Sequence, residues 1–377
     1  MTVKPAVPTA ARSISSPPVP QSTATKRTAL VVAPQWVGDA IVSLPLIAQL
    51  SQEVDAIDVL AMPGVAAVFE ACPHVRKVIT VAFQHGRLQW SLRWQTAQQL
   101  QGHYQIAVLL PNSLKSALIP WLARIPIRRG MLGEHRYLLL NDRRTPPPDQ
   151  GKKRPSMLAH YLRLAAHPIA SDAIDAWGRH RPRLAETRLP RPTTAPRGPL
   201  LVLCPGAEYG PAKQWPAAHF VTVALDWLAA SSDHTVVILG GPKEKGIGEQ
   251  IRQSITDRHG LTTQVQSLCG TTSLAEAFGW LSLAQMVVSN DSGLMHAAAA
   301  LDVPVVGLFG SSDPDHTPPL SASARAISLR LSCSPCFKRE CPLGTTACLR
   351  DLAPEQVMMA MREIQSTPTR IDHTHPI

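Results

Sequence analysis

Polar, glycine-containing segments hold most of the side chains that could catalyse a reaction or bind a ligand. Their sequences are PGAEYGPAK (205–213), GGPKEK (240–245), CGTTS (269–273), SNDSGLMH (289–296) and FGSSDPD (309–315). Each continues an apolar run with the length of a buried strand, and ligands of open α/β sheets bind at the carboxyl ends of the strands. We therefore expect these segments to lie around one site.

The segment 289–301 has the chemistry of an anion site at the start of a helix. Ser292 and Gly293 would open that helix, where free N–H groups and the helix dipole favour a phosphate. His296 follows Ser292 by four residues and so lies on the same helix face. Simple N-capping by Asn290 or Asp291, together with a buried histidine, explains the same residues equally well.

Two further side chains fit a nucleotide-diphosphate ligand. Lys213 is a cation suited to a leaving diphosphate, although a solvated surface lysine is the commoner case. Glu244 could accept hydrogen bonds from a ribose, or it could simply favour the dipole of the helix that follows. The glycine spacing matches neither a Walker A loop nor G-x-G-x-x-G, which argues against an NTPase and a dinucleotide oxidoreductase.

A carboxylate stands in the turn PQWVGDA (34–40), between a strand pattern at 28–33 and a helical pattern at 41–50. Asp39 in this turn could cap the helix or act as a general base. The turn alone does not distinguish these two roles.

Two other groups of residues raise the question of a metal. Asp313-x-Asp315 could hold a divalent cation, but a proline-containing turn explains it better. Cys333, Cys336, Cys341 and Cys348 could form a tetrahedral thiolate site, or they could be reduced structural thiols, which we favour because the spacing is not that of two C-x-x-C knuckles. We therefore predict no metal ion and no cofactor.

Strand and helix patterns alternate twice along the chain, which predicts two doubly wound α/β domains in tandem. Strand patterns occur at 28–33, 56–62, 77–83 and 104–110, and again at 200–206, 235–241, 265–270, 285–291 and 303–310. The region 124–197 is basic and irregular. We expect a disordered tail at 1–27, domains at 28–185 and 199–355, a Pro/Arg-rich linker at 186–198, and a C-terminal helix and tail at 356–377.

Composition limits the partners and the location. Of 377 residues, 37 are Lys or Arg and 27 are Asp or Glu, a net charge of +10 that favours an anionic partner. No apolar run reaches the roughly 18–20 residues that cross a bilayer, and no secretory signal is present. Basic residues without interleaved aromatic residues argue against nucleic acid. We expect a cytoplasmic protein.

Four long segments together resemble glycosyltransferase family 9, the ADP-heptose:lipopolysaccharide heptosyltransferases. They are PQWVGDAIVSLPL, CPGAEYGPAKQWP, SNDSGLMHAAAALDVPVVGLFGSSDPDHTPPLS and CSPCFKRECPLGTTACL. The resemblance is greatest to the heptosyltransferase II branch. Glu208 and Tyr209 stand where the heptosyltransferase I branch has threonines. The family fold is GT-B, two Rossmann-like domains that face each other across a cleft.

The resemblance implies an inverting transfer of L-glycero-D-manno-heptose from ADP-heptose to heptosyl-Kdo2-lipid A. It implies Asp39 as the base, Lys213 as a diphosphate contact, and Asp291, Ser292, Gly293 and His296 as the donor-phosphate helix, with Glu244 on the ribose. The lipid-anchored acceptor is anionic, which gives Arg128, Arg129, Arg143, Arg144 and 152–154 a partner. We expect a monomer, peripheral at the inner membrane.

Two alternatives stay open from the sequence. One is heptosyltransferase I, or another family 9 enzyme with a different acceptor. The other is a non-catalytic protein that binds zinc or an anion through the cysteines and the basic surface.

Overall fold

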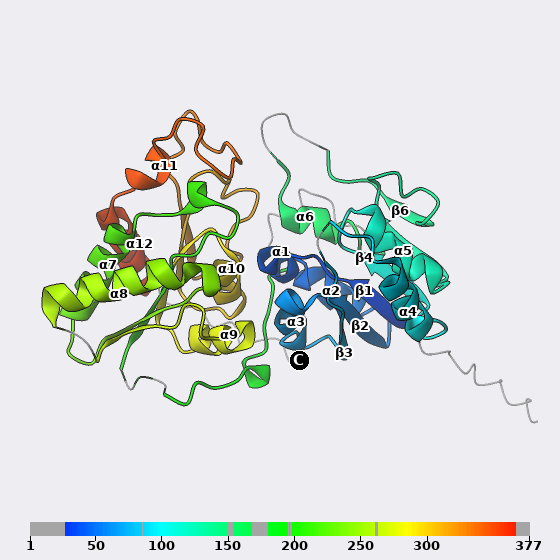
Figure 1. Cartoon of the computed structure of the whole chain (residues 1–377), viewed down its shortest axis with the longest axis horizontal. Coiled ribbons are helices and arrows are strands. Elements are labelled where there is room, and N and C mark those ends of the chain that lie inside the picture. Colours follow the sequence, from blue (N-terminus) through cyan, green and yellow to red (C-terminus); the bar gives the residue numbers. More distant parts are fainter. Residues whose placement is uncertain are drawn as a thin grey trace, which may run out of the picture.

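The computed structural model describes residues 27–84, 86–148, 154–167, 180–194, 196, 198–260 and 263–366. The chain forms two lobes, each built on one parallel six-stranded sheet (Figure 1). The expected disordered tail at 1–27 lies outside the described residues except for Arg27, and so do Lys152, Lys153 and the end of the chain from 367.

The first lobe alternates strands and helices along residues 28–162. Its elements are β1 (Thr28–Val32), α1 (Val37–Val42), α2 (Leu44–Leu50), β2 (Ala56–Ala61), α3 (Pro63–Glu70), β3 (Lys77–Thr80), α4 (Trp90–Leu100), β4 (Ile106–Leu109), α5 (Leu114–Leu122), β5 (Ile127–Met131), β6 (Asp142–Arg144) and α6 (Met157–Leu162). The strand order is β3-β2-β1-β4-β5-β6, the doubly wound order. Apolar side chains of α1, α2, α3 and α6 cover one sheet face, and those of α4 and α5 cover the other.

The second lobe repeats this plan. Its elements are β7 (Leu200–Cys204), α7 (Ala217–Ala229), β8 (Thr235–Ile238), α8 (Lys245–His259), β9 (Val265–Ser267), α9 (Leu274–Ser282), β10 (Met286–Asn290), α10 (Gly293–Ala300), β11 (Val305–Leu308), β12 (Ala324–Ile327), α11 (Ala347–Arg350) and α12 (Pro354–Ser366). Short 3-10 turns are η2 (Glu186–Arg188), η3 (Pro211–Lys213) and η4 (Pro242–Glu244). The strand order is β12-β11-β10-β7-β8-β9. Read from β9, it is the same order as in the first sheet. The expectation of two doubly wound parallel sheets is confirmed.

Three strands were absent from the sequence expectation: β5, β6 and β12. The first two lie in the region that we expected to be irregular. Arg129 of β5 is buried because its Nε donates to Asp142 Oδ2 of β6 at 2.6 Å, and Glu53 lies at 3.7 Å. The ion pairs let a charged side chain occupy an interior strand position, which an apolar pattern cannot reveal.

The described strands of the first sheet fall within 28–185 and those of the second within 199–355, and we retain these ranges as our proposed domains. The linker range 186–198 begins with η2. The expected C-terminal helix starts two residues earlier than 356, at Pro354, and packs against α7, β11 and β12. In the described part of the chain, none of the helices has both the length and the hydropathy to cross a bilayer.

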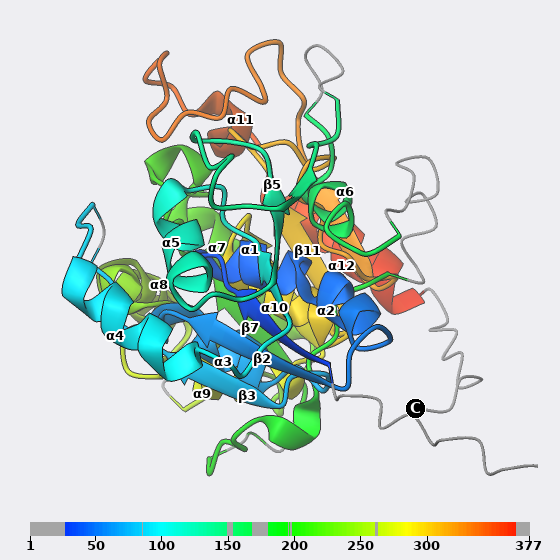
Figure 2. The ribbon, with the colours of Figure 1, turned by 90° about the vertical axis from the view of Figure 1, so that its right-hand side faces the viewer.

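The lobes meet through helices of both. α1 packs against α10 and α3 against α9, and Figures 1 and 2 both place α1 beside α10. One apolar core continues across this boundary, from Ile41 and Phe69 of the first lobe to Phe278 and Met295 of the second. The elements that follow β1 and β10 at their carboxyl ends are therefore in direct contact.

Candidate active site

Asp39 lies in the first turn of α1 and does not cap it. The helix begins at Val37 and its N-cap residue is Trp36, which makes no side-chain capping bond. In the described residues no donor forms a hydrogen bond with the Asp39 carboxylate, although it is half-buried. Burial raises the pKa of Asp39 to about 6, the Lys213 ammonium opposes that rise, and the Asp291 carboxylate adds to it. An aspartate with this pKa remains mostly ionised at neutral pH.

Lys213 ends the short turn η3 and points at the opposite loop of its own lobe. Its Nζ lies 2.5 Å from Asp291 Oδ2 and 5.2 Å from the centre of the Tyr209 ring. The expected alternative, a solvated surface lysine, is wrong, since 18% of the side chain is exposed. The ammonium group is held by a carboxylate and an aromatic ring.

Neither Asn290 nor Asp291 caps α10, so the capping alternative is wrong. Ser292 is the N-cap residue, without a side-chain capping bond, and its Oγ lies 3.2 Å from Ser289 Oγ. Asn290 receives a hydrogen bond from Trp215 N and donates one to Pro205 O, so it fixes the 205–215 loop. Asp291 pairs with Lys213. The first N–H groups of α10 are thus not satisfied by either residue.

His296 and Gly293 face the other lobe. The His296 ring is buried beside Gly38, where a Cβ would lie 3.0 Å from His296 Cδ2, and its Nε2 is 3.9 Å from Asp291 Oδ1. Burial lowers the pKa of His296 to about 4, so the ring is neutral at pH 7. A Cβ on Gly293 would lie 2.7 Å from Val37 Cβ. The absence of a side chain at Gly293 therefore lets α1 approach the start of α10 closely.

Glu244 is buried at the end of η4, among glycines of two loops. A Cβ on Gly240 would lie 2.7 Å from Glu244 Cβ, and one on Gly206 would lie 3.1 Å from its Cγ. No described donor pairs with the carboxylate. Gly206 belongs to the same loop as Lys213, so Glu244 adjoins the group formed by Asp39, Lys213, Asp291 and His296 without being in it.

The two candidate metal sites have different outcomes. Asp313 Oδ1 accepts the backbone N–H of Asp315 at 2.9 Å, which confirms the turn. The four C-terminal cysteines line a cavity of about 30 Å³ together, and all four are free thiols. Across the described ranges no three His, Cys, Asp or Glu side chains are arranged to hold a metal ion.

Most of the basic residues expected to meet the acceptor have structural partners instead. Arg129 is buried on Asp142, Arg144 Nε lies 2.9 Å from the same carboxylate, and Arg128 donates to Leu139 O and Ile125 O. Arg143 alone of these four is exposed. Arg154 stacks on the Phe337 ring of the second lobe at 3.9 Å.

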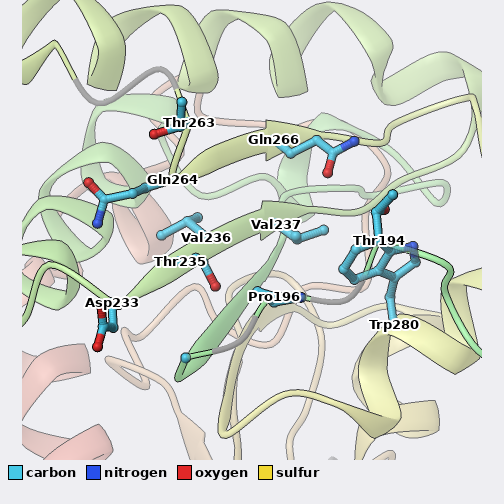
Figure 3. A pocket seen from close by; sticks show the side chains of 11 residues that line it. Thr194, Pro196, Asp233, Thr235, Val236, Val237, Thr263, Gln264, Gln266 and Trp280 are labelled. Atoms are coloured by element: carbon cyan, nitrogen blue, oxygen red, sulfur yellow. The ribbon is translucent and has the colours of Figure 1, made fainter.

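A cavity of about 420 Å³ lies elsewhere in the second lobe (Figure 3). Its lining comes from the starts of β8 and β9, from the linker and from Trp280 of α9. Asp233 is the one carboxylate in that lining, and none of the predicted site residues belongs to it. The cavity is therefore separate from the Asp39–Lys213 group.

Sequence reasoning missed Tyr161 of α6. Its side chain is buried, and burial together with the nearby Asp39 charge raises the pKa of the phenol well above its usual value. The residue lies in the region that we expected to be irregular, and it has no motif around it. Only the packing of α6 against α1 brings it near Asp39.

Comparison with known proteins identifies the family. The model of glycosyltransferase family 9 (heptosyltransferase) matches residues 93–347. Lipooligosaccharide heptosyltransferase 2 of Haemophilus ducreyi is 35% identical over 356 residues, covering 89% of this chain and 98% of the relative. The corresponding Haemophilus influenzae protein is 38% identical over 312 residues, covering 80% and 88%.

The structure of Escherichia coli ADP-heptose LPS heptosyltransferase II superposes with a TM-score of 0.71 at 31% identity, covering 89% of this chain and 98% of that chain. The two parallel sheets and their helices thus form the GT-B fold of these enzymes. The chain belongs to glycosyltransferase family 9, the heptosyltransferases.

Proposed function

We propose that this chain transfers L-glycero-D-manno-heptose from ADP-heptose to heptosyl-Kdo2-lipid A, with inversion at the anomeric carbon. The observation that carries the proposal is the Asp39 carboxylate, which has no described hydrogen-bond donor and lies within electrostatic reach of the Lys213–Asp291 pair of the other lobe. A base on one lobe could accept the proton of the acceptor, while a cation and a helix N-terminus on the other lobe could stabilise the leaving ADP. These groups are sufficient for a single displacement at the anomeric carbon. The names of its relatives, heptosyltransferase 2, support the choice of acceptor.

The chemical step follows from these positions. The acceptor oxygen forms a bond to the anomeric carbon while its proton passes to an Asp39 carboxylate oxygen. The bond between that carbon and the ADP oxygen breaks, and the electron pair leaves with ADP. Because the pKa of Asp39 is about 6, the base is ionised at pH 7 yet more basic than an exposed aspartate.

The second lobe would stabilise the leaving group. Lys213 and the unsatisfied N–H groups at Ser292 and Gly293 would meet the charge that develops on the diphosphate. For this, the Lys213 ammonium must turn from Asp291 to the diphosphate or bridge both. Glu244 would accept hydrogen bonds from the ribose hydroxyls, which supplies the partners that its carboxylate lacks.

The remaining assignments are part of the same proposal. The first lobe would bind the acceptor and the second the donor. The protein would act as a monomer, on the cytoplasmic side, peripheral at the inner membrane, because its acceptor carries a lipid anchor.

The test compares the wild-type protein with Asp39→Ala and, as a control, Asp226→Ala. Asp226 is an exposed aspartate of α7 that lies 3.5 Å from Arg362. Each is incubated with ADP-heptose and either Kdo2-lipid A or heptosyl-Kdo2-lipid A, with and without a chelator, and the product mass is measured.

We expect product from heptosyl-Kdo2-lipid A with the wild type and the control, and none with Asp39→Ala, while calorimetry still detects ADP-heptose binding by all three. Near-normal turnover by Asp39→Ala would rule out the base assignment. Product from Kdo2-lipid A alone would assign the other acceptor.

A further inference from the structure

Large apolar side chains are exposed together on the first lobe. They come from α4, the start of α5 and the loops before α4 and after β5, and we call them the aromatic face: Leu88, Trp90, Trp94, Leu114, Tyr137 and Leu138. Trp90 and Trp94 are 49% and 47% exposed and lie one turn apart on α4, while Leu138 is 90% exposed. An exposed apolar group of this kind marks an interaction surface.

Hydrogen bonds hold the segments of the aromatic face in one rigid group. Arg93 of α4 donates to Leu88 O at 2.7 Å and to Lys115 O at 2.9 Å, and Lys115 Nζ donates to Gly86 O at 2.8 Å. The backbone N–H of Leu114 donates to Glu134 Oε2 at 2.8 Å. The segments before α4, at the start of α5 and after β5 are therefore tied to one another.

A buried arginine fixes the segment that carries Tyr137 and Leu138. Arg136 donates to Pro111 O at 2.7 Å and to Met131 O at 2.5 Å, with 1% of its surface exposed. Its neighbours Tyr137 and Leu138 point outward because Arg136 occupies the interior. The exposure of Leu138 is thus built into a fixed loop.

The chain segments that form the aromatic face are rich in basic residues. Residues 81–144 contain nine Lys and Arg against two Asp and Glu. Arg87 and Arg143 are exposed beside the apolar side chains, with the Arg143 guanidinium 5.9 Å from the centre of the Tyr137 ring. Of the two acids, Glu134 caps the start of α5 and Asp142 is paired with Arg129.

The loops of the aromatic face lie at the same end of the sheet as the Asp39 turn. The loops after β3, β4 and β5 leave the sheet at the same edge as the turn after β1, because all four strands are parallel. Figures 1 and 2 both show α4 and α5 side by side on the side of the first lobe away from the second. The aromatic face and Asp39 thus share the carboxyl end of the first sheet, with the aromatic face on the sheet side opposite to α1.

We propose that the aromatic face docks the first lobe onto an anionic lipid bilayer. Trp and Tyr side chains favour the level of lipid headgroups, and exposed Arg and Lys are drawn to anionic lipids. Shallow insertion of apolar side chains with basic neighbours is the pattern of peripheral binding without a spanning helix. This inference rests on the proposed function for the peripheral location, and it adds the surface that contacts the lipid.

The experiment measures sedimentation of the full chain with vesicles of phosphatidylglycerol and phosphatidylethanolamine, or of phosphatidylcholine alone. The variants are Leu138→Gln, Trp90→Gln/Trp94→Gln and Arg87→Gln/Arg143→Gln. The matched control is Met359→Gln, which changes a side chain of the second lobe that is 57% exposed. Sedimentation velocity without vesicles reports the oligomeric state of each variant.

We expect the wild type and the control to bind the anionic vesicles, and Leu138→Gln and Trp90→Gln/Trp94→Gln to bind about tenfold more weakly. Each lost arginine charge should cost about fivefold, and only with the anionic vesicles. Transfer to a delipidated acceptor should be unchanged in Leu138→Gln and in Trp90→Gln/Trp94→Gln. Equal vesicle binding by the wild type and the variants would overturn the proposal. A dimeric wild type and monomeric variants, with vesicle binding intact, would also overturn it, because the face would then be a contact between two copies of the chain. Vesicle binding without transferase activity would overturn the proposed function instead.

Discussion

The ammonium group of Lys213 and the carboxylate of Asp291 form an ion pair of 2.5 Å, so the cation that we propose for the donor diphosphate already has an anionic partner. We expect Lys213→Met to lower kcat by about a hundredfold, since one preorganised donor is removed from the leaving group. The matched control is Lys243→Met, because the Lys243 side chain is 74% exposed and forms a surface ion pair with Glu208. Steady-state kinetics of both variants check this.

A double variant of this ion pair distinguishes a structural role of Lys213 from a catalytic one. Lys213→Met leaves Asp291 buried without its cation, which should lower Tm. Adding Asp291→Asn should restore Tm and leave kcat low. If kcat recovers together with Tm, Lys213 has a structural role only.

The raised pKa of Asp39 predicts the pH dependence of transfer. A base must be ionised, so kcat/KM should fall about tenfold per pH unit below about 6. Because Asp291 raises this pKa and Lys213 lowers it, Asp291→Asn should move the acidic limb to lower pH and Lys213→Met should move it to higher pH. Profiles of kcat/KM from pH 5 to 9 test this. Shifts of both variants in one direction would contradict the arrangement.

Glu244 should set donor affinity rather than rate. We expect Glu244→Gln to weaken ADP binding about tenfold, since a hydrogen bond to a charged acceptor is lost, with kcat nearly unchanged. The wild type should bind 2′-deoxy-ADP more weakly than ADP, and the variant should bind both equally. The control is Glu249→Gln, on the exposed side of α8. Calorimetry measures the affinity of the three proteins for each of the two nucleotides. If Glu244→Gln preferred ADP over 2′-deoxy-ADP as strongly as the wild type does, Glu244 would not contact the ribose.

The contact of Gly293 with Val37 should be essential for the relative position of the lobes. A Cβ at Gly293 would lie 2.7 Å from Val37 Cβ, so Gly293→Ala should push α1 from α10, lower Tm by about 2 °C or more and reduce kcat at least tenfold. Val37→Gly in the same chain removes the clashing atom and should recover part of both. Gly246→Ala, where a Cβ would meet nothing within 4 Å, should leave kcat unchanged. Unaltered kcat in Gly293→Ala would show that α1 tolerates the displacement.

The apolar pattern of the sequence predicted the two sheets, but it did not predict the strands that carry charged residues. Apolar runs located nine strands, because buried parallel strands are continuous and apolar. β5 was missed, since Arg128 and Arg129 interrupt its pattern, and the partner that buries Arg129 is Asp142 on another strand. Such compensation is a property of the tertiary structure.

The residue types of the candidate site could be selected from the sequence, but their geometry could be predicted only in part. Spacing placed His296 and Ser292 on one helix face, which is correct for an isolated helix, but the ring lies against Gly38 of the other lobe. Nothing local to Asp39 or Lys213 indicates that they are neighbours. The packing of α1 on α10 brings Asp39 of the first lobe close to Lys213 of the second.

That packing also has a consequence for the stability of an activated sugar in water. The proposed base belongs to the first lobe, and the proposed diphosphate contacts belong to the second. A donor held by the second lobe alone would lie apart from Asp39, the proposed base. If α1 moved away from α10, a bound donor would lose the proposed base, so the contact between these two helices would couple both transfer and hydrolysis to the joined arrangement of the lobes.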